Sequence, residues 1–65
     1  MGAGYGRMLE KILKNNGCTF VRFGKGDHRI WFSPMTNRQV TVDYKSENKN
    51  TANGTLKDAG INHKF

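Results

Sequence analysis

The sequence contains little of several residue types that define common protein classes. It has one cysteine and one proline among 65 residues, and only five acidic side chains. The single cysteine, Cys18, excludes an internal disulfide framework and a cluster of thiolate ligands for structural zinc. No apolar run is long enough for a signal peptide or a membrane span. We therefore expect a cytoplasmic protein that does not associate with a membrane.

Basic residues outnumber acidic ones, and this surplus indicates the kind of partner to expect. Eleven lysines and arginines against five aspartates and glutamates give a net charge of +6 and an isoelectric point near 9.9. A nucleic acid, an anionic surface or an acidic protein suits such a chain. The carboxylates are scattered rather than paired as in a metal-dependent nuclease, and the two histidines stand far apart. We therefore expect neither a metal site nor a cofactor.

Hydrophobic periodicity predicts two helices in a single domain that covers residues 1–65. Apolar residues recur at three- and four-residue spacing in residues 5–14, a pattern typical of an amphipathic helix, and Gly17 follows as its C-terminal cap. A second helix is expected over residues 52–59, because Ala52, Thr55, Leu56 and Ala59 fall on one helical face that would dock on the sheet, and Gly60 has the form of a glycine cap. The sequence also allows disorder in the glycine-bearing residues 1–6.

Between the helices, β-branched and aromatic residues predict three strands, over residues 18–23, 29–32 and 38–44. Short turns join them into an antiparallel meander. The order α-β-β-β-α then places two helices on one face of a three-stranded antiparallel sheet. This α+β arrangement resembles that of double-stranded-RNA-binding domains.

Alternation along the strands predicts which side chains face the helices. Phe20, Phe23, Ile30 and Phe32 are expected in the core rather than as platforms for stacked bases. Trp31 alternates with Ile30 and Phe32, so we expect it on the opposite face, where RNA or a partner protein could meet it.

A glycine-bearing loop, residues 24–27, leads directly to His28 and is the main candidate for a functional site. Glycines allow an abrupt turn and a close approach to a ligand, while histidine exchanges protons near neutral pH. Basic residues stand on both sides of the loop. By default these glycines are hairpin-turn residues and the histidine is solvated, so a catalytic role needs further support.

That support comes from a family resemblance that covers nearly the whole chain from Leu9 onward. Its motifs are Asn16-Gly17 after the first helix and the segments 19–22, 26–31, 40–42 and 51–61. In order and spacing they resemble the HicA-type toxins, the mRNA interferases of toxin–antitoxin pairs. The family often has serine at the position of Asp27 and a second histidine at that of Arg29, so the resemblance does not imply the route of the second proton.

The resemblance implies a type II toxin that cleaves mRNA without a metal, with His28 as its catalytic residue. Histidine suits this chemistry, because a base must take the proton of a 2′-hydroxyl before its oxygen attacks the adjacent phosphorus. Cations beside it would stabilise the charge on the phosphoryl oxygens. We expect the RNA-binding residues to be Arg22, Lys25, Gly26 and Arg29. A HicB-type antitoxin is expected to mask the site and to contact Trp31, so that the toxin occurs as a monomer or in a hetero-oligomer with its antitoxin.

Two other functions fit the same composition. A non-catalytic module would bind double-stranded RNA by shape, although the second helix carries only Lys57 against Asp58. A small interaction domain would use its basic face to bind an acidic protein and no nucleic acid. Incubation with single-stranded RNA in EDTA separates the three functions by cleavage, by retention without cleavage, or by neither.

Overall fold

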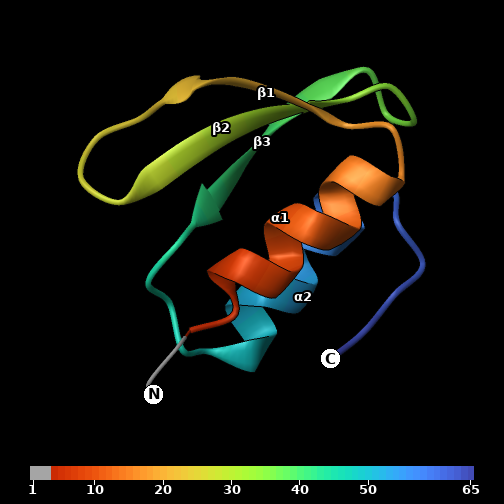
Figure 1. The fold of residues 1–65 in the computed structure, drawn as a ribbon. Helices are drawn as coiled ribbons and strands as arrows, with labels where there is room; N and C mark the ends of the chain where they lie inside the picture. The colour runs from red at the N-terminus through yellow and green to blue at the C-terminus, as the bar shows by residue number, and fades with distance from the viewer. Residues whose placement is uncertain (1–3) are drawn as a thin grey trace.

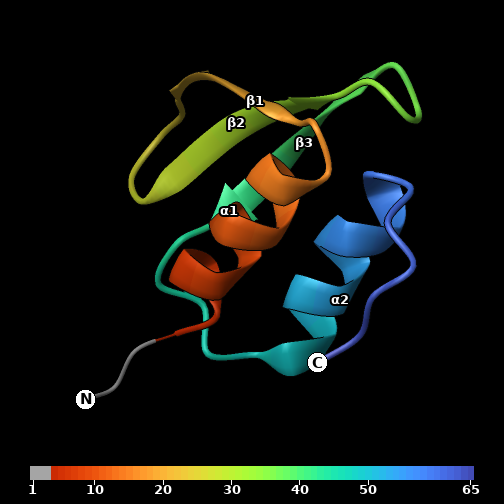
Figure 2. The ribbon, with the colours of Figure 1, turned by 45° about the vertical axis from the view of Figure 1, so that its right-hand side comes forward.

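The computed structural model describes residues 4–65 and contains two helices and one antiparallel sheet (Figure 1). The elements are α1 (Gly6–Asn15), β1 (Thr19–Phe23), β2 (His28–Ser33), β3 (Arg38–Asp43) and α2 (Lys49–Asp58). The strands lie in the order β1-β2-β3, and both neighbouring pairs are antiparallel. Both helices lie side by side on one face of this sheet (Figures 1 and 2). The predicted α+β fold is therefore confirmed.

Helix α1 forms where the periodicity predicts it and ends at the predicted glycine. Its buried positions include Leu9 and Leu13, whose side chains are 2% and 0% exposed. Gly17 has a φ of 86°, in the left-handed region that glycine adopts without a steric penalty. The backbone N–H of Cys18 then donates to the carbonyl of Leu13, so the chain leaves the helix tightly and enters β1.

Helix α2 begins at an asparagine cap and docks on β3 through its predicted face. The Asn48 side chain accepts hydrogen bonds from the backbone N–H groups of Asn50 and Thr51, at 2.8 and 3.2 Å. The four residues expected on the docking face are all buried: Ala52, Thr55, Leu56 and Ala59. The helix therefore depends on tertiary contacts, as expected for a segment of weak helix propensity.

The core lies between the helices and one face of the sheet. Among residues 4–65, ten buried apolar residues form it: Leu9, Leu13, Cys18, Trp31, Val40, Val42, Ala52, Leu56, Ala59 and Ile61. Ser33 is also fully buried, and its hydroxyl donates to the carbonyl of Ala59 at 2.6 Å. No helix among residues 4–65 has the length and apolarity needed to cross a membrane.

The predicted orientation of β2 is wrong. Trp31 is only 8% exposed and belongs to the core. Its side chain lies on the helix side of the strand, as do those of Arg29 and Ser33. Ile30 and Phe32 alternate with Trp31 and are half-buried on the face that carries no helix. Alternation separates the two sets of side chains, but the helices decide which set is covered, and α1 covers the indole.

The expectation that Phe20 and Phe23 lie in the core is also wrong. All five residues of β1 are exposed, with Phe20 at 44% and Phe23 at 67%. The strand lies at the edge of the sheet, whereas the helices pack on β3 and on each other (Figure 2). An edge strand that extends beyond the helical layer thus leaves its aromatic residues in solvent.

The start of the described chain has a defined place in the fold. The backbone N–H of Tyr5 donates to the carbonyl of Ser46, and Gly6 is buried as the first residue of α1. Residues 1–3, the rest of the segment for which the sequence allows disorder, lie outside the described residues.

Candidate functional site

His28 lies at the end of the tight hairpin that joins β1 to β2. The N–H of Gly24 donates to the carbonyl of His28 at 2.7 Å, and the N–H of His28 donates to the carbonyl of Lys25 at 3.2 Å. Gly26 turns the chain with a φ of 65°, in the region that L side chains rarely adopt. These contacts make His28 the first residue of β2 and leave its side chain exposed. The predicted glycine turn is therefore real, and it presents the imidazole to solvent.

Gly24 has a steric role beside the histidine. A Cβ atom on Gly24 would lie 3.2 Å from the Cβ of His28 and 3.5 Å from its carbonyl oxygen. The contact with the His28 Cβ is tighter than side chains normally make, so His28 would have to shift by a few tenths of an ångström, whereas the contact with the carbonyl oxygen is an ordinary one. The small residue at position 24 thus permits the observed placement of the imidazole.

A small hollow of about 170 Å³ lies at this end of the sheet. Six residues line it: Phe23, Gly26, Asp27, His28, Arg29 and Tyr44. They come from the end of β1, from the hairpin, from the start of β2 and from the residue after β3. The backbone N–H of Tyr44 donates to the carbonyl of Asp27 at 3.1 Å and joins the last of these segments to the hairpin.

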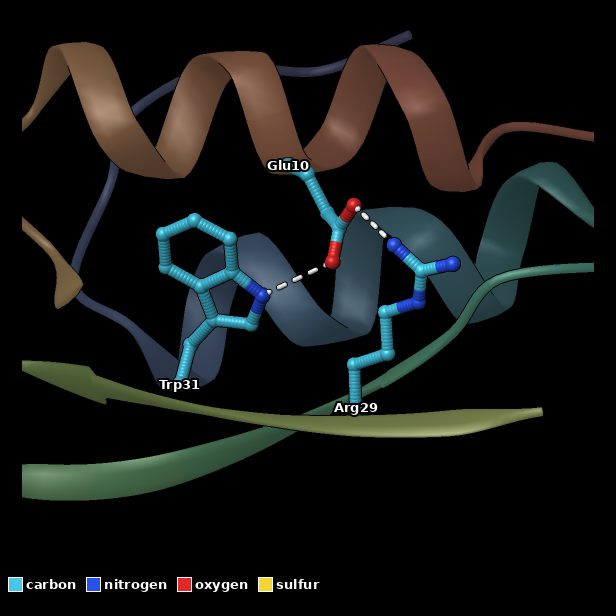
Figure 3. Close-up of polar contacts among 3 residues, drawn as sticks. All are labelled: Glu10, Arg29 and Trp31. Atoms are coloured by element: carbon cyan, nitrogen blue, oxygen red, sulfur yellow. Dashed lines mark hydrogen bonds and ion pairs between the residues drawn. The ribbon is translucent and has the colours of Figure 1, made fainter. Parts of the chain in front are cut away.

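The guanidinium of Arg29 is held at one side of the hollow. Its Nη1 lies 2.9 Å from Glu10 Oε1, and its Cζ lies 3.8 Å from the centre of the Tyr44 ring and 5.5 Å from that of Phe23. The second carboxylate oxygen of Glu10 accepts from the indole N–H of Trp31 at 2.9 Å (Figure 3). The Arg29 side chain is 32% exposed, so the cation is fixed without being removed from solvent. The contacts with Glu10 and Tyr44 thus fix the position of the guanidinium, whose charge is paired with that of Glu10.

Among the predicted site residues, Gly26, His28 and Arg29 line the same hollow, although His28 and Arg29 are successive residues of β2 and their side chains leave opposite faces of the strand. Lys25 is an exposed residue of the same hairpin, while Arg22 lies opposite Ile30 on β1 and shares the helix-free face of the sheet. Trp31 does not line the hollow: it is buried under α1, where its indole shares the Glu10 carboxylate with Arg29. The sequence-based reason for placing Trp31 at a partner interface, its presence on an open face, therefore does not hold.

Four residues near the site were not singled out from the sequence for this role. Glu10 reaches Arg29 from α1, Tyr44 stacks on it, and Phe23 lines the hollow at the end of β1. Asp43 lies directly opposite His28 in the β2–β3 ladder. The strand register could have paired Asp43 with His28, but the contacts of Glu10 and Tyr44 depend on how α1 and the end of β3 pack. The sequence carries no local signal for them.

In the described part of the chain, the second histidine, the possible metal ligands and the cysteine lie away from this hollow or form no site. His63 lines a second hollow of about 440 Å³ along α2 and the C-terminal segment, which shares no lining residue with the hollow at His28. Among residues 4–65, no three histidine, cysteine, aspartate or glutamate side chains gather as ligands for a metal ion. Cys18 is a buried free thiol in the core.

The chain matches one known protein family over most of its length. The model of the family described as HicA toxin of bacterial toxin-antitoxin matches residues 6–61, from the first residue of α1 to the residue after the glycine that follows α2. No curated protein and no solved structure gives a significant match. The family match covers more than half of the chain and includes every helix and strand described above. This chain belongs to the HicA toxin family of bacterial toxin–antitoxin systems.

Proposed function

We propose that this toxin is a metal-independent endoribonuclease that cleaves mRNA at the hollow containing His28. The observation that carries the proposal is the exposed imidazole at the glycine hairpin, in one hollow with a fixed guanidinium, in a chain of the HicA family. His28 is the general base, and Arg29 is the cation that the phosphate meets. Membership of this family implies an antitoxin partner for the toxin.

The proposed reaction is a transfer within one RNA strand. His28 takes the proton of a 2′-hydroxyl, and the oxygen forms a bond to the adjacent phosphorus while the bond from phosphorus to the 5′-oxygen breaks. The departing 5′-oxygen takes a proton from water, and the other product ends in a cyclic phosphate. As negative charge builds on the phosphoryl oxygens, the Arg29 guanidinium stabilises it, because Glu10 and Tyr44 already hold the cation in position.

The remaining RNA contacts are assigned to the hairpin and to β1. Lys25 and Arg22 are exposed cations on either side of Gly24, so both can meet phosphates of a strand that crosses the hollow. Gly26 has no atom within 4 Å of the place a Cβ would take, which leaves room for the RNA backbone at the turn. Because the proposed substrate is mRNA, we expect this activity in the cytoplasm.

We further assign neutralisation to a HicB-type antitoxin that covers the His28 hollow. A protein with acidic side chains suits a chain of charge +6, and cover over the hollow would keep RNA from the imidazole. Trp31 is not part of this interface, because its side chain is buried in the core. RNA and the antitoxin should then compete for the toxin.

The test is the cleavage of single-stranded RNA in EDTA by the wild type and by His28→Ala. Loss of a general base should lower the rate by about 100-fold or more, while the melting temperature stays close to that of the wild type, since His28 is exposed. His63→Ala is the matched control and should cleave normally. Near-normal cleavage by His28→Ala would remove this residue from the mechanism, and binding without cleavage by the wild type would favour the RNA-binding module.

A further inference from the structure

Phe23 has an unusual position for a phenylalanine in a small domain. Its side chain is 67% exposed, more than the other large apolar side chains that are exposed among residues 4–65. Among the described residues that line the His28 hollow, it is also the only one with a purely hydrophobic side chain. An exposed phenylalanine contributes little to the core, and together with Phe20, which is 44% exposed and packs on it, Phe23 forms an exposed apolar patch of the kind that marks a binding surface.

The contacts of Phe23 hold its ring but do not cover it. Phe20 meets the ring edge to face at a centroid distance of 5.0 Å, and the Arg29 guanidinium lies 5.5 Å from its centre. Register pairs Phe23 with Arg29 across β1 and β2, so the strand ladder fixes the ring next to the cation. The result is an aromatic surface that is fixed in position and still accessible.

We propose that Phe23 is the stacking platform for one unpaired nucleobase of the RNA that lies at His28. This inference rests on RNA being the substrate of the proposed function. Sites that enclose a whole small molecule have volumes of about 300–1,000 Å³, so a hollow of about 170 Å³ suits one part of a longer ligand. Because Phe23 and His28 line the same hollow, the stacked base belongs to a nucleotide next to the phosphate that reacts.

Charge favours RNA over a protein as the occupant of this platform. The ring lies beside the guanidinium of Arg29 and near the exposed Lys25, where a base can stack while its own phosphate meets a cation. Stacking on an aromatic ring is tolerant of base identity, since every base has a π-face. Phe23 therefore contributes affinity and position along the strand, and it reads the sequence only weakly.

The test measures binding of short single-stranded RNAs in which every 2′-hydroxyl is methylated, so that no attacking oxygen is present and cleavage does not interfere. Fluorescence anisotropy compares the wild type with Phe23→Ala, Phe23→Leu and Phe23→Trp. Val21→Ala is the matched control, because Val21 is an exposed apolar residue of the same strand that does not line the hollow. A series of RNAs, each with one base removed to leave an abasic sugar, locates the stacked nucleotide.

We expect Phe23→Ala to bind intact RNA about tenfold more weakly, Phe23→Leu to be similarly weak, and Phe23→Trp to retain wild-type affinity. One abasic position should weaken the wild type by a similar factor and should have no further effect on Phe23→Ala. Val21→Ala should bind as the wild type does. Melting temperatures of all variants should remain similar, because the ring is exposed.

Two results would overturn the platform. One is equal RNA affinity of the wild type and Phe23→Ala. If that variant has instead lost affinity only for the antitoxin, the ring belongs to a protein interface. The other is a Phe23→Ala variant whose loss of RNA affinity, relative to the wild type, is the same with every abasic RNA as with the intact RNA. No base would then be coupled to the ring, and the effect of the substitution would be indirect. Failure of the wild type to cleave unmodified RNA refutes the proposed nuclease instead, and it leaves the binding measurement unaffected.

Discussion

The carboxylate of Glu10 is expected to be a major source of stability, and its replacement gives the sharpest test of the packing. It lies between α1 and β2, where one oxygen accepts from Arg29 and the other from the indole of Trp31, both at 2.9 Å (Figure 3). Its side chain is 16% exposed, and Trp31 is 8% exposed. Glu10→Ala therefore leaves a largely buried indole N–H without its partner and releases the guanidinium.

The size of the effect follows from these two contacts. A hydrogen bond from a buried N–H to a charged acceptor contributes about 1.5 kcal/mol or more. The ion pair to Arg29 is partly open to solvent, so its contribution is about 1 kcal/mol, near the upper limit for exposed pairs and well below that for buried ones. Together they give about 2.5 kcal/mol, against a total stability of roughly 3–10 kcal/mol for a chain of this length.

Urea denaturation and thermal melting measure this loss directly. We expect a fall of about 10–20 °C in the melting temperature of Glu10→Ala. Glu47→Ala is the control, because it removes an exposed carboxylate and should change stability by no more than about 0.5 kcal/mol. A cycle that combines Glu10→Ala with Trp31→Phe should give a coupling energy of about 1 kcal/mol. Equal stabilities of Glu10→Ala and Glu47→Ala, or no coupling to Trp31, would refute the role given to this carboxylate.

Three further outcomes are expected. Gly54→Ala should raise the free energy of unfolding by up to about 1 kcal/mol, since a Cβ at this helical position meets open space. Gly6→Ala should lower it, because a Cβ there would overlap the backbone after β3. Thermal melts of both variants test these opposite signs. Asn48→Ala should cost about 1 kcal/mol in urea denaturation through loss of the helix cap, and an unchanged midpoint would contradict the cap. Lys25→Ala should reduce the slope of log K for single-stranded RNA against log salt by about 0.7, while Lys49→Ala on α2 should leave the slope unchanged.

Most of the secondary structure was predictable, because its signals are local. The docking face of α2 follows from spacing alone, and Gly17 and Gly60 both take the left-handed conformation expected of glycine caps. The strand boundaries shifted by no more than one residue, so that His28 and Ser33 entered β2. The glycine hairpin and the exposed histidine were also predictable, since a turn needs only neighbouring residues.

The use of the two sheet faces was not predictable in the same way. Alternation separates Trp31 from Ile30 and Phe32, but it does not say which set lies under the helices. A count of apolar residues favours burial of the pair. The tryptophan is buried instead, because α1 places Glu10 where the indole N–H can donate, and this match depends on contacts between residues 21 positions apart.

The same arrangement links the stability of β2 to its proposed chemistry. Trp31 and Ser33 fix the register of the strand on the helix side, through Glu10 and the carbonyl of Ala59. Side chains alternate between faces, so a slip of β2 by one residue would turn His28 toward the helices and would expose the indole. Glu10 and the Ala59 carbonyl would then lose their donors. The buried contacts of one face thus hold the imidazole in solvent on the other, and substitutions at Trp31 or Ser33 should reduce stability, whereas substitution at His28 should reduce activity alone.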